Sequence, residues 1–464
     1  MTLDNAEATE PRRDDSLYLS RDGSLYLSGN YAPVLEEVTA YDLSVDGKIP
    51  AELSGRLIRV GPNPIAPVDD PVNHNWLTGA GMLHGVRLRD GKAEWYRNRF
   101  VRGTDVQMAL GEPAPPGPTR GYDAANNTHV LKIGKGTYAL TEAGCLPMLL
   151  SYDLMTEARS DFGGTMGDAF TAHPRVDPLT GETHAITYTP SQEKVQYQVV
   201  TTGGRVRRIV DVPLPGHVMV HDMCLTPKYA VILDMPVTFS QQAAMSGDPL
   251  PLRWTPDHGC RVGLLPREGT AEDVVWCELP GTPFVFHTGN SYDAADGTVV
   301  MDVVRYESMY YTNSLSAFED EARLYRWTAD PATGKVTEQL LDDHAQEFPR
   351  YDDRVTGQDY RYSYTVTSDD VPRGFTGLLK YDVKRGTSER VDYGHGMLTM
   401  ETVFVPSAGS SAEDDGWLMA YVHDATTERC DVVIRHAQDL ADPVATIRLP
   451  ARVPFGFHGS WIAD

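Results

Sequence analysis

The sequence predicts an all-β protein built as a seven-bladed β-propeller. Seven hairpin-like units, each with two short strands around a turn, follow one another from about residue 29 onward. A four-stranded blade with its turns needs about 40–50 residues, and long helical patterns are scarce in this chain. Radial repetition suits such a series because it leaves only short strand edges exposed. The turn centres lie near Gly91, Gly136, Gly203, Gly269, Gly334, Gly386 and Asp439.

The chain is expected to form one domain over residues 29–464, preceded by a mobile extension over residues 1–28. The pentapeptide SLYLS occurs twice in that extension, at residues 16–20 and 24–28. The Asp22-Gly23 turn between the copies leaves a small hairpin as the alternative. If the Gly136 hairpin belongs to a neighbouring blade, the count becomes six or eight. Two stacked β-sandwich domains are the alternative fold, although no linker divides the chain.

The composition of the chain limits which molecules it is expected to bind and where in the cell it is expected to be located. The 464 residues include 65 acidic and 41 basic residues, a net charge of −24, which argues against a nucleic-acid partner. Contact with a membrane would then require an exposed apolar patch rather than charge. No apolar run reaches the about 18 residues of a membrane helix, and the N-terminus lacks the apolar core of a signal peptide. With five scattered cysteines and no CxxC pair, we expect free thiols and a cytoplasmic location.

Four histidines open four similar stretches: His173 in TAHPRVDP, His221 in VHDMCLTP, His287 in FHTGNSYD and His458 in GFHGSWI. A polar strand, a turn and an apolar strand follow three of them. A lone histidine is more often a surface or structural residue, and the chain has 14. If the hairpins repeat around an axis, however, these four lie at the same end and form a metal site. Imidazoles can hold zinc, copper, nickel or iron. Ligation without a carboxylate leaves two positions open in an octahedral geometry, which suits iron(II) that meets oxygen.

Three glutamates are candidates to orient these histidines. A metal-bound imidazole commonly has its other ring nitrogen held by a carboxylate. Glu142, Glu347 and Glu401 lie in apolar or small-residue surroundings, where an unpaired carboxylate would be costly. Most glutamates are solvated surface charges. The chain has no HExxH, no GxxxxGK[ST], no GxSxG and no GxGxxG, which argues against the corresponding hydrolase and nucleotide sites.

Several longer motifs occur in a fixed order. They are GNYAPV (residues 29–34), GKIPAELSGRLIRVGPNP (47–64), HNWLTGAGMLHGVRL (74–88), WTPDHGCRVGLLPR (254–267), EFPR (347–350) and PFGFHGSW (454–461). At these residues the chain resembles the carotenoid cleavage oxygenase family, which includes stilbene-cleaving relatives. The resemblance covers roughly residues 29–464.

The resemblance implies a seven-bladed β-propeller with a loop-and-helix cap over one face. One iron(II) per chain would lie on the axis, held by the four histidines named above. The resemblance pairs Glu142 with His221, Glu347 with His287, and Glu401 with His458. It leaves His173 without a carboxylate and places Thr128 near an open coordination position.

The implied activity is an iron(II)-dependent dioxygenase that cleaves a conjugated double bond of a carotenoid or apocarotenoid into two carbonyl products. Its partners would be oxygen and an apolar olefin. The chain departs from the family at residues 77–81, where an Asp-Gly-Asp-Gly run is frequent, and at Ala143. Stilbene-cleaving relatives often carry a lysine where this chain has Thr141, so a stilbene or phenylpropene is the second candidate. Two further hypotheses are a non-catalytic metal-containing propeller that binds a ligand and a calcium-dependent propeller hydrolase with an Asp/Asn-rich axis.

Overall fold

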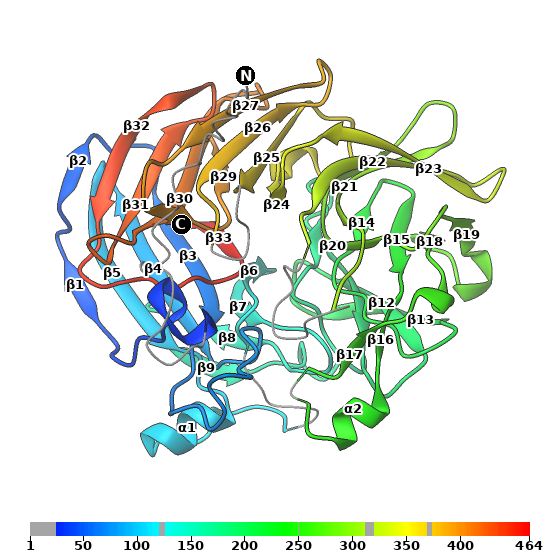
Figure 1. Ribbon diagram of the computed structural model, residues 1–464, viewed down its shortest axis with the longest axis horizontal. Helices are drawn as coiled ribbons and strands as arrows, with labels where there is room; N and C mark the ends of the chain where they lie inside the picture. Colours follow the sequence, from blue (N-terminus) through cyan, green and yellow to red (C-terminus); the bar gives the residue numbers. More distant parts are fainter. Residues whose placement is uncertain (1–24, 120–125, 249, 311–319, 369–373) are drawn as a thin grey trace, which may run out of the picture.

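The structure, a computed structural model, describes residues 25–119, 126–248, 250–310, 320–368 and 374–464 (Figure 1). Short β-sheets stand around a common centre. In the described residues there are two α-helices, α1 (Thr104–Leu110) and α2 (Gln241–Met245), both short. No helix in this part of the chain is long and apolar enough to cross a membrane. The all-β, propeller-like architecture predicted from the sequence is confirmed.

Five sheets have four to six strands each. The first contains β1 (Thr39–Tyr41), β5 (Lys92–Phe100), β4 (Gly81–Arg89), β3 (Gly55–Pro62) and β33 (Gly459–Ala463). The second contains β6 (His129–Ile133), β7 (Gly136–Leu140), β8 (Met148–Leu150) and β9 (Thr156–Arg159). The third contains β10 (Arg175–Val176), β11 (Thr183–Tyr188), β12 (Lys194–Val200) and β13 (Val206–Pro213).

The remaining two follow later in the chain. One contains β24 (Gln346–Arg350), β25 (Tyr362–Thr367), β26 (Gly377–Asp382) and β27 (Thr387–Asp392). The other contains β2 (Val45–Gly47), β32 (Asp439–Arg448), β31 (Arg429–His436), β30 (Gly416–Asp424) and β28 (Met397–Thr399), with β29 (Val403–Pro406) also paired to β30.

An eight-stranded sheet lies between the third sheet and the β24 sheet. Its order is β14 (Cys224–Leu225), β15 (Tyr229–Asp234), β18 (Arg261–Pro266), β19 (Val275–Glu278), β23 (Lys335–Asp342), β22 (Arg323–Asp330), β21 (Val299–Tyr306) and β20 (Phe284–Asp293). The expected seven separate blades are therefore not observed, because β19 and β23 join what would be two blades through the Glu278↔Lys335 pair. A small ribbon of β16 (Val237–Phe239) and β17 (Leu252–Trp254) flanks α2.

The hairpins occur where the sequence predicted them. Five of the seven predicted turn centres fall between two consecutive antiparallel strands, and the other two, Gly136 and Asp439, are the first residues of β7 and β32. At the first turn Asp90 and Gly91 both adopt positive φ, +50° and +72°. An Asp-Gly pair tolerates this conformation, and its twist matches the flanking strands.

Burial explains the strand compositions. Strand β3 is buried at every position because neighbouring sheets cover both of its faces, and its sequence is mainly apolar. Strand β13 lies further out and alternates half-buried with exposed residues over most of its length. Apolar sequence therefore marks the inner strands of a sheet, and alternating sequence marks its outer strands.

The two ends of the described chain meet in one sheet. Strand β33, the last strand, pairs antiparallel with β3, with Leu57 opposite Trp461. The Asp464 carboxylate accepts hydrogen bonds from Arg87, Ser54 and Tyr152. This pairing closes the ring, because strands from both ends of the described chain share one sheet.

The expected extension at residues 1–28 falls largely outside the described residues, and its boundary stays a prediction. The second SLYLS copy does not form a strand: residues Leu25–Leu27 form a 3₁₀ turn. Tyr26 is buried, with its ring edge-on to Tyr31 at 5.2 Å and stacked with Trp76 at 6.4 Å. Residues 25–28 are therefore packed on the domain.

Candidate metal centre

The four histidines lie at strands that form sheet edges. His173, His221 and His458 precede β10, β14 and β33, and His287 belongs to β20. Strands β6, β20, β24 and β33 surround the centre of the ring in Figure 1. The repeated position of these histidines therefore brings residues from 173 to 458 to one place.

The imidazoles form one buried cluster. One ring nitrogen from each histidine lies within 4.8 Å of those of the other three. The Nε2 atom of His287 is 3.4 Å from that of His221 and 3.1 Å from that of His458. The exposed fraction is between 3% and 6% for all four.

Three glutamates contact the outward-facing nitrogens, in the expected pairs. The His221 Nδ1 lies 3.0 Å from both carboxylate oxygens of Glu142. The His287 Nδ1 lies 2.6 Å from Glu347 Oε2, and the His458 Nδ1 lies 2.9 Å from Glu401 Oε1. Among the described residues no carboxylate bonds to the His173 ring.

These contacts test whether a cation fits. A carboxylate can only accept, so each of the three Nδ1 atoms carries the proton, and in a neutral ring the Nε2 is then a lone pair. With the rings neutral, the Nε2 atoms of His221, His287 and His458 converge as lone pairs, and the buried Nε2 of His173 has no hydrogen-bond partner. Lone pairs at 3.1–3.4 Å repel one another unless a cation lies among them. The donor set fits a divalent transition metal.

Two of these glutamates accept further hydrogen bonds that fix their carboxylates. Glu347 accepts hydrogen bonds from the Tyr306 hydroxyl at 2.8 Å and from the Phe348 amide. Glu401 accepts from the Gly459 amide at 2.8 Å and from Arg350 at 3.3 Å. Burial opposes ionisation of Glu401, but Arg350 and His458 outweigh it and hold the pKa of that carboxyl well below its ordinary value.

Burial also sets the state of the histidines. It lowers the pKa of His173 well below its usual value, and the surrounding imidazoles add to the effect. It lowers the pKa of His458 to about 4 against the opposing pull of Glu401. For His287 the Glu347 carboxylate outweighs burial, so its pKa lies above the usual value. His173 and His458 are therefore neutral at pH 7 and have lone pairs available for a metal.

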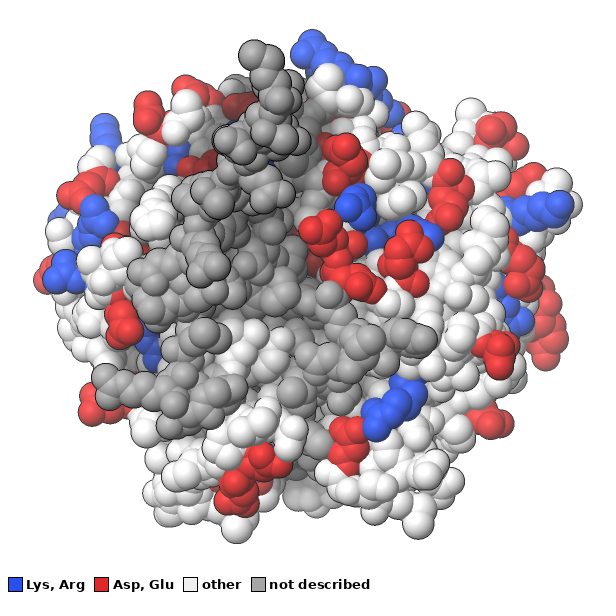
Figure 2. All heavy atoms as spheres, viewed as in Figure 1, with Lys and Arg blue, Asp and Glu red and all other residues white. Residues whose placement is uncertain are grey.

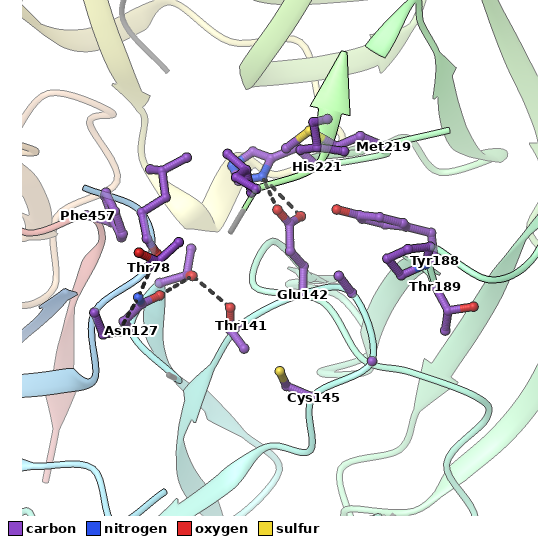
Figure 3. A pocket seen from close by; sticks show the side chains of 18 of the residues that line it. Thr78, Asn127, Thr141, Glu142, Cys145, Tyr188, Thr189, Met219, His221 and Phe457 are labelled. Atoms are coloured by element: carbon purple, nitrogen blue, oxygen red, sulfur yellow. Dashed lines mark hydrogen bonds and ion pairs between the residues drawn. The ribbon is translucent and has the colours of Figure 1, made fainter. Parts of the chain in front are cut away.

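A cavity of about 810 Å³ reaches this cluster. It contacts His221, His287, His458 and Glu142, of which Figure 3 labels His221 and Glu142. Phe286 stacks on the His221 ring at 4.0 Å, and both line the cavity. Most of the wall beside the histidines is apolar or aromatic, including Tyr188, Met219, Leu252, Phe286, Phe348 and Phe457.

Thr128 lies on the cavity wall, in a hydrogen-bonded chain between Asn127 and Thr141; Figure 3 labels these two partners. Its hydroxyl donates to Asn127 Oδ1 at 3.0 Å, so Thr141, 3.1 Å away, donates to Thr128. Asn127 in turn donates to the carbonyls of Leu77 and Gly79. These bonds fix the segment in which the chain departs from the family motif. That Thr128 borders an open coordination position stays a prediction.

The sequence did not single out the partners of the glutamates. Tyr306 ends a strand whose apolar pattern predicts only that the strand is buried in the core. Arg350 appeared only as the last residue of the EFPR motif, with no role of its own. His129 was also missed. It begins β6, is buried, and its Nδ1 lies 2.7 Å from the Ala172 carbonyl. No local pattern marks any of the three, because their partners are 41 or more residues away.

Comparison with known proteins identifies the family. The family model described as "Retinal pigment epithelial membrane protein" matches residues 31–463. A "Carotenoid cleavage oxygenase" of Mycobacterium tuberculosis is 41% identical over 491 aligned positions, which cover 94% of this chain and 97% of the relative. The chain belongs to the carotenoid cleavage oxygenase family.

Other family members agree in sequence and in fold. A "Carotenoid 9,10(9',10')-cleavage dioxygenase 1" of Phaseolus vulgaris is 31% identical and covers 95% of this chain and 89% of its own. The crystal structure of a Pseudomonas brassicacearum lignostilbene dioxygenase superposes with a TM-score of 0.86 at 28% identity, over 95% of this chain and 98% of the other. Cobalt-substituted Synechocystis ACO gives 0.84 at 27% identity, with the same coverage. The chain is thus an enzyme with a propeller-like fold, and four of its histidines form a buried cluster.

Proposed function

We propose that this protein is an iron(II)-dependent dioxygenase that cleaves a conjugated carbon–carbon double bond of a carotenoid or apocarotenoid into two carbonyl products. One observation carries the proposal: three carboxylate–imidazole pairs turn bare Nε2 atoms toward a single buried point. One iron per chain is held by His173, His221, His287 and His458, and three of these are oriented by Glu142, Glu347 and Glu401.

Iron fits the donor set better than zinc or calcium. Structural zinc usually has cysteine ligands close together in sequence, whereas these ligands span 285 residues, from 173 to 458. Neutral imidazoles leave the full charge on the ion, and four of them leave room for other ligands. When bound, iron(II) supplies the activation of oxygen. A calcium-dependent hydrolase would need oxygen ligands at this point.

The residues of the chain bind, orient and exclude water. An apolar polyene suits a wall formed by Tyr188, Met219, Phe286 and Phe457. Because these side chains also cover the open side of the cluster, they keep water from the reacting bond. Glu142 is the one orienting glutamate that lines the cavity, and its side chain is 17% exposed. The substrate therefore approaches from the Glu142–His221 side.

The wall favours a carotenoid over a stilbene. Thr141 is neutral and its proton is already donated to Thr128, so it offers no cation to a phenolate. The M. tuberculosis relative, named for carotenoid cleavage, is also more similar in sequence than the lignostilbene dioxygenase, at 41% against 28% identity. A stilbene or phenylpropene is the second candidate because that dioxygenase shares the fold at a TM-score of 0.86.

Product analysis tests the proposal. Iron(II)-loaded protein is incubated in air with a C40 carotenoid, an apocarotenal, resveratrol and isoeugenol, and the products are analysed by mass spectrometry. We expect two carbonyl compounds whose masses sum to that of the carotenoid or apocarotenoid plus two oxygen atoms. The variant His287→Ala should lose both bound iron and product. No product from protein shown to hold one iron would contradict the proposed activity and support a non-catalytic binder.

We also propose that an apolar rim around the cavity contacts membranes that store the substrate. Met108 is 78% exposed on α1 and Met245 is 83% exposed on α2, and both helices lie at the lower rim in Figure 1. Residues 104–106 of α1 and residues 250–252 beside α2 line the cavity. Acidic and basic side chains are interspersed over the face in Figure 2, so contact would depend on apolar burial. Co-sedimentation with neutral phosphatidylcholine vesicles should weaken in the double variant Met108→Ser/Met245→Ser. Equal binding by the variant would contradict this.

We further propose that the eight-stranded sheet corresponds to two blades, β14–β15–β18–β19 and β20–β21–β22–β23. The single pair Glu278↔Lys335 joins them, whereas adjacent strands inside each half share two to seven pairs. With the five smaller sheets this gives the seven blades implied by the family, within one domain over residues 29–464. The histidines at the two outer edges of the eight-stranded sheet, His221 and His287, then begin two successive blades.

A further inference from the structure

His173 is the histidine of the cluster that no glutamate orients, although its Nε2 is buried and without a partner. We infer that His129 positions His173, by holding the main chain beside it in place of a carboxylate on its ring. This inference rests on the proposed metal site, and it concerns a residue outside the four-histidine cluster.

The hydrogen bonds of His129 fix its tautomer. Its Nδ1 lies 2.7 Å from the carbonyl oxygen of Ala172, which precedes His173. A carbonyl can only accept, so Nδ1 carries the proton and donates it. The Nε2 is then an acceptor, and the Ser460 hydroxyl donates to it at 3.4 Å. The ring is 6% exposed, so water does not compete for either contact.

The start of β6 also holds a second ligand. The amide of His458 donates to the Thr128 carbonyl at 3.1 Å. The His129 ring lies between the two sites, with its centroid 6.0 Å from that of His173 and 5.1 Å from that of His458. Residues 128 and 129 therefore fix the separation of two histidines that are 285 residues apart in sequence.

His129 acts through this backbone contact and not on the substrate. It does not line the cavity, and its ring nitrogens are not part of the cluster of converging ligand atoms. It is thus a positioning residue. Loss of the His129 side chain should weaken metal binding and lower the turnover number, while the KM for the substrate stays nearly unchanged.

The test compares variants that keep or lose the donor. His129→Asn places an amide N–H near the Nδ1 position, whereas His129→Gln places it near Nε2 and His129→Leu removes it. Metal affinity is measured by competition with a chelator, and site geometry by the visible absorption spectrum of the Co(II)-loaded protein. We expect about a tenfold loss of affinity and a shifted cobalt spectrum for Leu and Gln, as for other residues behind metal ligands. The Asn variant should restore both.

A matched control is His84→Leu. His84 is equally buried, and its Nδ1 bonds the Tyr96 hydroxyl at 2.9 Å, away from the cluster. This variant should lower stability and leave the cobalt spectrum unchanged. An unchanged spectrum and affinity in His129→Leu, or an Asn variant no better than Gln, would overturn the inference. If His129→Leu does not fold, the Asn and Gln pair decides alone. If the parent protein binds no metal, the proposed function fails instead.

Discussion

Replacing Glu347 by glutamine should weaken metal binding about 100-fold. The carboxylate is 1% exposed and accepts from the His287 ring, the Phe348 amide and the Tyr306 hydroxyl. A glutamine oxygen can keep the first two bonds, and the Tyr306 hydroxyl can rotate to accept from the new amide. The variant therefore removes charge and preserves packing. Residues behind metal ligands typically contribute 10–100-fold to affinity, and full burial places Glu347 at the upper end.

Glu142→Gln is the matched comparison. Its side chain is 17% exposed to the cavity and bonds the His221 ring at 3.0 Å. Because water can screen this charge, we expect only about a tenfold loss. The difference between the two variants corresponds to about 1.4 kcal/mol.

The assay is a competition titration of iron(II) against a chelator, with circular dichroism to verify folding. Equal losses in the two variants would refute the argument that burial sets the size of the effect. Unchanged affinity in Glu347→Gln would refute the role of the carboxylate altogether.

Three further predictions concern stability. Burial lowers the pKa of His184 to about 4, so as the pH falls the unfolded chain is protonated at this histidine before the folded protein is. The free energy of unfolding should therefore fall by about 3 kcal/mol between pH 6.5 and pH 4, and this histidine should have no effect on it above pH 7. Denaturant titrations of His184→Gln should show a smaller loss over that window. Arg350→Met leaves the buried Glu401 charge with less compensation and should lower the unfolding free energy by about 3 kcal/mol, partly regained in Arg350→Met/Glu401→Gln; full stability in the single variant would contradict this. Asp464→Ala removes a partly exposed partner of Arg87 and should cost about 1 kcal/mol in a thermal melt, and less in high salt.

Local chemistry explains what the sequence could predict. Turn residues such as Asp90-Gly91 fix hairpins within a few residues, so all seven turn centres were found in the right places. The repeated hairpins also predicted that His173, His221 and His287 lie at the same end of their hairpins. The pairing of glutamates with histidines came from the family resemblance, because nothing local links Glu347 to a ring 60 residues away.

Long-range contacts explain what it could not predict. The β19–β23 pairing that joins two blades depends on one parallel contact between strands 57 residues apart. Tyr26 lies in the repeated SLYLS segment, and no local pattern shows that it packs on Trp76. In the sequence, nothing distinguishes His129 from an ordinary strand residue; its contact with the Ala172 carbonyl exists only in the folded protein. In each case the decisive partner belongs to another part of the ring.

Closing the ring and assembling the site are one structural event. His458 directly precedes β33, the strand that pairs with β3 from the other end of the chain. Its amide bonds Thr128, the next amide bonds Glu401, and its ring faces His287. The fourth ligand therefore takes its place only when β6, β28 and β33 have met. A metal that binds the closed ring and not the open chain must stabilise closure by the same free energy with which closure improves the site. A metal bound by the four histidines would thus be coupled to both ends of the chain through a strand of five residues.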